Sequence, residues 1–111
     1  MPAAQINADV RSILAEFRRG LEVIYGDRMV RLVLFGSQAR GDAFADSDID
    51  VLVVLRGLVK SGEEISRCGE FLAAVCLEHD TVLTPVYISE ERFQNERSPL
   101  MLNVRREGLD V

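Results

Sequence analysis

The sequence contains few of the residues from which disulfide frameworks and zinc sites are built. Among its 111 residues are two cysteines, Cys68 and Cys76, and one histidine, His79. The cysteines lie eight residues apart within one helical pattern, about two turns, which is out of disulfide reach on a straight helix. We expect both to be reduced core residues, and a zinc site would need more ligands than these three side chains easily give.

The chain also lacks an excess of basic residues. It carries 13 Lys and Arg against 18 Asp and Glu, which gives a formal net charge of -5. Proteins that bind the backbone of polymeric nucleic acid need clustered positive charge to displace counterions, so the composition argues against such a partner. A nucleotide chelated to a metal ion remains compatible with it, because the metal supplies local positive charge.

Long apolar runs, repeats and low-complexity segments are missing as well. No apolar run approaches the length of about 20 residues that spans a bilayer, and the first residues lack the basic and apolar regions of a signal peptide. With 48% hydrophobic residues, 28% charged residues and three prolines, the composition is that of an ordinary folded protein. We expect a cytoplasmic protein with a single domain over residues 1–111.

Apolar residues spaced by threes and fours, with capping residues at the ends, predict the helices. Asn7 should cap a first helix that runs to Tyr25, and Ser61 with Glu64 has the spacing of a capping box for a second. Ser89 should cap a short helical turn, and Ser98 a last helix that Gly108 stops. The buried face of the second helix should contain Ile65, Cys68, Leu72, Val75 and Cys76.

Short runs rich in β-branched and large apolar residues predict strands at 30–35, 49–55 and 81–88. Pro85 lacks a ladder donor, so the third strand should lie at an edge or contain a bulge. The order helix, strand, strand, helix, strand, helix predicts an α/β or α+β fold, with a small mixed sheet of three to four strands backed by helices.

Two aspartates at the start of the second strand are the candidate metal ligands. Asp48 and Asp50 are two residues apart, so on a strand their side chains share one face, with Cα atoms roughly 6.5 to 7 Å apart. Aspartate is depleted in strands and like charges on one face repel, which a divalent cation relieves. A solvated turn is the alternative. Asp42 and Asp46 are expected to be turn residues.

Gly36 and Ser37 follow the first strand directly and are candidates to hold phosphates. Glycine lets the backbone approach a ligand, backbone N–H groups can face anionic oxygens, and the serine hydroxyl adds a donor. Arg40 can either add positive charge to the phosphates or pair with a local aspartate. The stretch is neither a Walker A loop nor a dinucleotide-binding G-x-G-x-x-G pattern.

Together these residues resemble the signature of the DNA polymerase β-like nucleotidyltransferase superfamily in its minimal, antitoxin-type form. The motif is Gly36-Ser37, ten further residues, and Asp48-Ile49-Asp50, with Arg40-Gly41 and Ser47 in between. The resemblance implies that Gly36 and Ser37 hold nucleotide phosphates and that Asp48 and Asp50 bind Mg²⁺ or Mn²⁺. The implied reaction transfers a nucleotidyl group, commonly AMP from ATP, to a hydroxyl.

The sequence departs from that family at one position. Active members usually add a third carboxylate from a neighbouring strand, whereas the candidate strand 81–88 contains no acid and has Thr84 at the expected place. Asp80, at the head of this strand, is the nearest substitute as a metal ligand. A catalytically weak or inactive nucleotide-binding module, acting by contact with a partner, is therefore the second hypothesis.

The resemblance also implies a partner. Minimal members of the family often act as antitoxins that modify a helical toxin of the HEPN ribonuclease type, so a protein of that type or a small molecule would provide the acceptor hydroxyl. An adenylyltransferase for aminoglycoside-like small molecules is a weaker alternative, because the chain offers no second domain. A homodimer through exposed helices or a strand edge is a further expectation.

Overall fold

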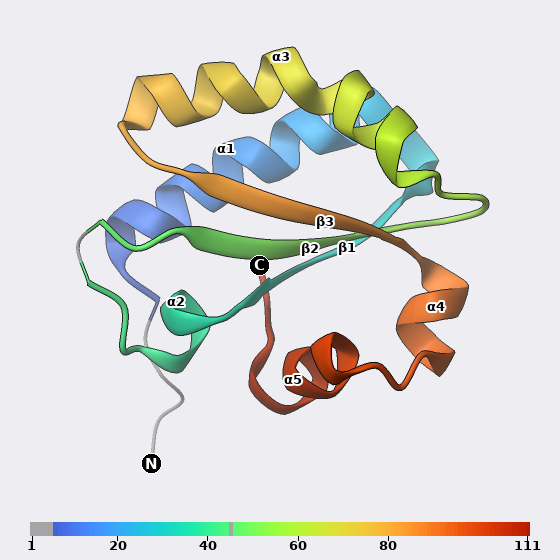
Figure 1. Cartoon of the computed structure of the whole chain (residues 1–111). Coiled ribbons are helices and arrows are strands. Elements are labelled where there is room, and N and C mark those ends of the chain that lie inside the picture. Colours follow the sequence, from blue (N-terminus) through green and yellow to red (C-terminus); the bar gives the residue numbers. More distant parts are fainter. Residues whose placement is uncertain (1–5, 45) are drawn as a thin grey trace.

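The computed structural model describes residues 6–44 and 46–111, which form one sheet between two helical layers (Figure 1). The helices are α1 (Ala8–Tyr25), α2 (Ser37–Arg40), α3 (Ser61–His79), α4 (Glu90–Asn95) and α5 (Pro99–Glu107), with a 3-10 turn η1 (Gly26–Arg28) after α1. The strands are β1 (Met29–Phe35), β2 (Ile49–Leu55), β3 (Leu83–Ser89) and β4 (Leu109–Asp110). No helix in these ranges is long and apolar enough to cross a bilayer.

The sheet is mixed, with the strand order β3-β2-β1-β4. β1 pairs antiparallel with β2 and, on its other side, with the two-residue β4, whereas β2 and β3 run parallel. The predicted mixed sheet of three to four strands backed by helices is confirmed. β3 is an edge strand, as predicted from Pro85, which lies opposite Val51 of β2.

Each face of the sheet is covered by its own pair of helices, α1 and α3 on one face and α4 and α5 on the other (Figure 1). Alternate residues of β2 enter the two cores, so that Val51 and Val53 pack with α1 and α3, and Leu52 and Val54 pack with α5. This alternation directs Asp50 to the same face as Leu52, toward the α5 side of the sheet. The strand that carries Asp50 is thus anchored from both faces.

Most predicted helix ends are confirmed. The Asn7 side chain accepts hydrogen bonds from the N–H groups of Asp9 and Val10, and Gly26 follows the last residue of α1. Ser89 caps α4 and Ser98 caps α5 in the same way, each by accepting a bond from a backbone N–H three residues later. Local capping chemistry therefore fixes three of the helix starts.

The start of α3 differs from the prediction. Lys60 takes the N-cap position without a side-chain hydrogen bond, and Ser61 is the first helical residue, so the predicted capping box does not form. Glu64 instead turns inward and is only 2% exposed, while Ile65 is 60% exposed. The prediction of Ile65 as a core residue was wrong because the buried glutamate occupies this part of the helix face. The rest of the predicted face is buried or half-buried.

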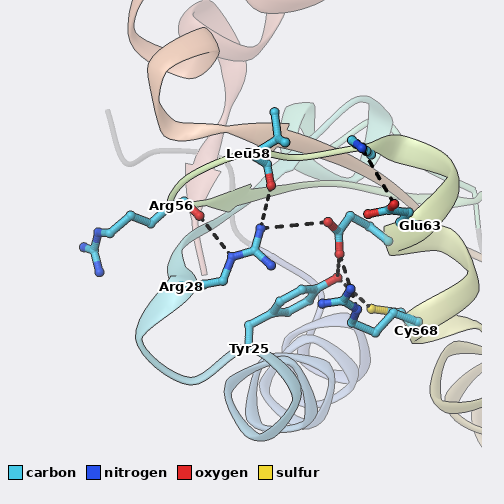
Figure 2. Close-up of polar contacts among 9 residues, drawn as sticks. Tyr25, Arg28, Arg56, Leu58, Glu63 and Cys68 are labelled. Carbon is cyan, nitrogen blue, oxygen red and sulfur yellow. Dashed lines mark hydrogen bonds and ion pairs between the residues drawn. The ribbon is translucent and has the colours of Figure 1, made fainter.

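Buried Glu64 lies among polar partners, of which Figure 2 labels Tyr25, Arg28 and Cys68. The Tyr25 hydroxyl donates a hydrogen bond of 2.8 Å to Glu64 and lies 3.2 Å from the Cys68 sulfur. Arg28, 3.9 Å from Glu64, donates hydrogen bonds to the carbonyls of Arg56 and Leu58. This group closes one end of the β1–β2 pair. Both cysteines are free, as expected.

Candidate functional site

The opposite end of the β1–β2 pair brings the candidate phosphate and metal residues together. Phe35, the last residue of β1, pairs with Asp50, so Gly36 lies beside the Asp50 carboxylate. Gly36 has a φ of 77°, and a Cβ added there would lie 2.5 Å from Asp50 Oδ2. Only glycine tolerates both this backbone conformation and this close approach. The spacing of the two motif halves therefore has a direct geometric cause.

Ser37 begins α2, a single helical turn for which the sequence predicted no helix. Its carbonyl accepts hydrogen bonds from the N–H groups of Gly41 and Asp42, whereas its own N–H and hydroxyl contact no partner among the described residues. Gly41, with a φ of 83°, ends the turn. Four residues are too few to show a helical period, and the only signal in the sequence is the glycine at either end. The turn leaves the Ser37 donors open to a ligand.

The electrostatics of the aspartate pair are unfavourable within the chain itself. Asp48 is exposed and Asp50 half-buried, and neither carboxylate forms a hydrogen bond or ion pair with residues 6–44 and 46–111. Burial raises the pKa of Asp50, the negative charge of Asp48 adds to this effect, and Arg40 opposes it. Two carboxylates facing one side beside a glycine cradle are a donor set that suits a hard divalent cation.

Arg40 is held by two acidic side chains rather than by the aspartate pair. Its guanidinium lies 3.2 Å from the carboxylates of both Asp42 and Glu107. These hydrogen bonds, first that of Asp42 and then that of Glu107, raise the pKa of Arg40. The expected pairing with a local aspartate is thus observed, and a contact between Arg40 and a phosphate stays a prediction.

Glu107 is a site neighbour that the sequence analysis did not find. It is the last residue of α5, and its side chain is 16% exposed. Its Oε1 atom accepts hydrogen bonds of 3.2 Å from the Gly36 N–H and from Arg40 Nη1. Glu107 follows Gly36 by 71 residues, so no local pattern could indicate the contact.

The register confirms that Thr84 of β3 lies directly opposite Asp50. Thr84 is exposed and supplies a hydroxyl where the resemblance implied a carboxylate. Asp80 lies before the strand, at the C-cap of α3 with a φ of 49°. Among the described residues it does not form a group with Asp48 and Asp50 in which ligand atoms lie within 4.8 Å of one another. Asp80 as a metal ligand therefore stays a prediction.

Other polar residues in the segment between β1 and β2 have structural contacts. Ser47 accepts a hydrogen bond of 2.8 Å from the Phe44 N–H, as expected of a turn hydroxyl. Asp46 and Asp80 line a hollow of about 410 Å³, and a larger one of about 610 Å³ extends from Asp80 toward α1. Neither hollow is lined by Asp48 or Asp50.

A separate group of ligand-type side chains lies between α1 and α3. Glu16, Glu78 and His79 bring one ligand atom each within 4.8 Å, the one such group of three in the described part of the chain. His79 is the last residue of α3, and its hydrogen bond to Glu16 lowers the pKa of that carboxyl. Exposed groups of this kind are common without an ion, so this group does not define the site.

The fold and the site together define a class of protein, a nucleotidyltransferase core with a Gly-Ser turn facing two strand carboxylates. The model of the nucleotidyltransferase domain family matches residues 14–99. This match covers more than half of the chain, and the protein belongs to this family.

Curated relatives from Methanocaldococcus jannaschii agree. "Putative protein adenylyltransferase MJ0141" is 30% identical over 78 residues, which are 70% of this chain and 78% of that protein. "Putative protein adenylyltransferase MJ0604" is 36% identical over 83 residues, which are 75% of this chain and 77% of that protein. The chain is thus similar to proteins named for adenylyl transfer to protein.

Solved structures show the same fold at low identity. A crystal structure titled as a putative nucleotidyltransferase from Sulfolobus solfataricus has a TM-score of 0.63 at 18% identity, covering 99% of this chain and 87% of that one. The Shewanella oneidensis complex of a tri-AMPylated HEPN toxin with an MNT antitoxin has a TM-score of 0.55 at 16% identity, covering 92% and 67%. At these identities the likeness establishes the fold.

Proposed function

We propose that the protein transfers AMP, or another nucleoside monophosphate, from a metal-bound nucleoside triphosphate to a hydroxyl of an acceptor. The observation that carries this proposal is the Asp48 and Asp50 pair beside Gly36, in which two carboxylates lie near enough to repel and have no neutralising partner among the described residues. Such a pair is costly unless a cation occupies it. ATP is the proposed nucleotide because the curated relatives are named as adenylyltransferases.

Each residue of the site has a distinct role in this proposal. Asp48 and Asp50 would hold Mg²⁺ or Mn²⁺, which when bound supplies charge neutralisation for the triphosphate and polarises the reacting phosphate. The open N–H and hydroxyl of Ser37, with the N–H of Gly36, would orient the phosphates. Arg40 would add positive charge on the same side. Because Thr84 lies opposite Asp50, the part of the site that β3 forms would carry no charge.

The acceptor is proposed to be a hydroxyl on a helical protein of the HEPN type. The support is that a structural neighbour is titled as an antitoxin in complex with a tri-AMPylated HEPN toxin. Recognition of the acceptor would depend on a partner's surface or on a small substrate held against the open sheet.

One specific observation favours a second candidate function. Because Thr84 stands where a third carboxylate would complete the metal site, the protein could bind the nucleotide and act by contact with its partner, without transferring a group. This alternative keeps the phosphate and metal contacts and removes only the chemical step.

The test is label transfer from ATP carrying a radioactive α-phosphate. The purified protein is incubated with labelled ATP, magnesium and the product of its neighbouring gene, and covalent label is measured. We expect label on the acceptor, and a loss of at least about 100-fold in Asp48→Asn and Asp50→Asn because the metal ligands are removed. Asp46→Asn, an exposed aspartate of the same connection, is the matched control and should retain transfer.

Two results would contradict the proposal in different ways. Label that persists in Asp50→Asn would refute the metal-site assignment. Binding of Mg-ATP with no transfer to the acceptor would favour the non-catalytic module.

A further inference from the structure

Glu107 makes contacts that set it apart from the other acidic side chains of the described chain. Its carboxylate accepts hydrogen bonds from the Gly36 N–H and from Arg40, both at 3.2 Å. These two donors are the backbone and side-chain groups that the proposed function assigns to nucleotide phosphates. A carboxylate and a phosphate are both anionic acceptors, and they compete for the same donors.

The C-terminal segment holds Glu107 in this position. Directly after α5, Gly108 passes so close to the helix and to β1 that an added Cβ would lie 2.4 Å from the Val104 carbonyl oxygen and 2.7 Å from Val33. β4 then pairs with Val33 and Leu34 of β1. Glu107 is therefore fixed at the end of β1 by backbone pairing on the strand that leads directly into Gly36.

Two other roles for Glu107 fit the contacts less well. As a third metal ligand it would have to join Asp48 and Asp50, yet within the described residues these three do not form a group with ligand atoms within 4.8 Å of one another. As a purely structural ion pair it would need only Arg40, whereas the bond from the Gly36 N–H places the same oxygen at the phosphate turn. Neither role explains why one oxygen accepts from both donors.

We propose that Glu107 is a residue of the nucleotide site whose carboxylate occupies the phosphate-binding donors when no nucleotide is bound. An incoming triphosphate must displace this carboxylate from Gly36 and Arg40, so Glu107 lowers the affinity for the nucleotide. The proposal rests on the proposed function, because it takes Gly36 and Arg40 as phosphate contacts. It adds a residue from α5 to a site otherwise built from β1, α2 and β2.

The test measures the dissociation constant for Mg-ATP by isothermal titration calorimetry. Glu107→Gln keeps the size and an acceptor oxygen but removes the negative charge, and we expect it to bind Mg-ATP about 10-fold more tightly. Asp42→Asn removes an equally close partner of Arg40 that does not contact Gly36, so it should give a smaller gain. Glu22→Gln, on the exposed side of α1, should change nothing.

The possible results distinguish a failure of this inference from a failure of the proposed function. If the wild-type protein and Glu107→Gln both fail to bind Mg-ATP, the proposed function fails. If the wild-type protein binds and Glu107→Gln binds no more tightly, or gains no more than Asp42→Asn, the inference alone is overturned. Should the amide variant not fold, Glu107→Asp withdraws the carboxylate by one methylene while keeping its charge, and the same direction of change is expected.

Discussion

The two ends of the β1–β2 pair carry acidic groups that the chain treats in opposite ways. At one end, Glu64 is 2% exposed and accepts a hydrogen bond from Tyr25, with the guanidinium groups of Arg28 and Arg67 3.9 and 3.8 Å away. At the other end, Asp48 and Asp50 share one face, and no described residue pairs with their carboxylates. The chain supplies its own partners for the structural charge and, among the described residues, none for the aspartate pair.

This difference has an energetic meaning. Removing a buried carboxylate costs stability because its partners are left buried without their acceptor. An aspartate pair that repels itself subtracts from stability, and such a cost is typical of a functional site. Removing the charge of Glu64 should therefore lower the stability of the fold, whereas removing the charge of Asp50 should raise it.

The largest expected effect is the loss of stability on removing the Glu64 carboxylate. Glu64→Ala should lower the free energy of unfolding by about 3 kcal/mol, because the Tyr25 hydroxyl and Arg28 lose a buried partner. Urea denaturation measures this change. Glu63→Ala is the matched control, since Glu63 is 60% exposed and its change should stay below about 0.5 kcal/mol. Equal effects of the two variants, or weaker Mg-ATP binding by folded Glu64→Ala, would remove the contrast between the ends.

An intermediate effect is expected at Gly36. Gly36→Ala should cost about 2 kcal/mol of stability and weaken Mg-ATP binding at least about 10-fold, because its methyl group meets Asp50 and its φ is positive. Gly57→Ala separates the two causes, since Gly57 has a φ of 85° with nothing within 4 Å of an added Cβ. We expect it to cost about 1 kcal/mol and leave the dissociation constant unchanged. Parallel losses of binding in both variants would contradict a specific role for Gly36.

The smallest expected effect is a gain in stability, where the other variants lose it. Burial raises the pKa of Asp50, so its charged form is disfavoured in the folded state, and its contribution to stability falls as the pH rises through that pKa. Asp50→Asn should therefore stabilise the metal-free protein by about 0.5 kcal/mol at pH 7. This gain should disappear below the ordinary pKa of aspartate. Thermal unfolding of both proteins across pH measures the difference, and a destabilised Asp50→Asn at pH 7 would show that the pair is structural.

The sequence predicted the elements because their signals are local. The strand at 49–55 matches the structure at both ends, and Asn7, Ser89 and Ser98 cap the helices as expected. Hydrophobic runs and capping side chains act within a few residues, so one sequence is enough to identify them. The place of Thr84 was an expectation from the family resemblance, and the register of β2 and β3 puts it opposite Asp50.

The features that escaped prediction depend on distant residues. Glu64 has the spacing of a capping residue, and its burial depends on distant partners, the Tyr25 hydroxyl from α1, 39 residues away, and the guanidinium group of Arg28. Glu107 reaches Gly36 only because α5 and β4 return to β1. The repulsion within the aspartate pair was predictable from the spacing of the two residues. Of the two acidic partners of Arg40, Asp42 was predictable because it is close in sequence, whereas Glu107 was not.

Pro85 has a consequence for how the sheet meets other chains. An edge strand presents unpaired backbone groups that can recruit another strand, and a proline removes a donor from that row. Because β3 forms the edge next to β2, Pro85 interrupts the outer row beside Thr84. The proline thereby disfavours open-ended growth of the sheet by strand addition at the edge that carries Thr84.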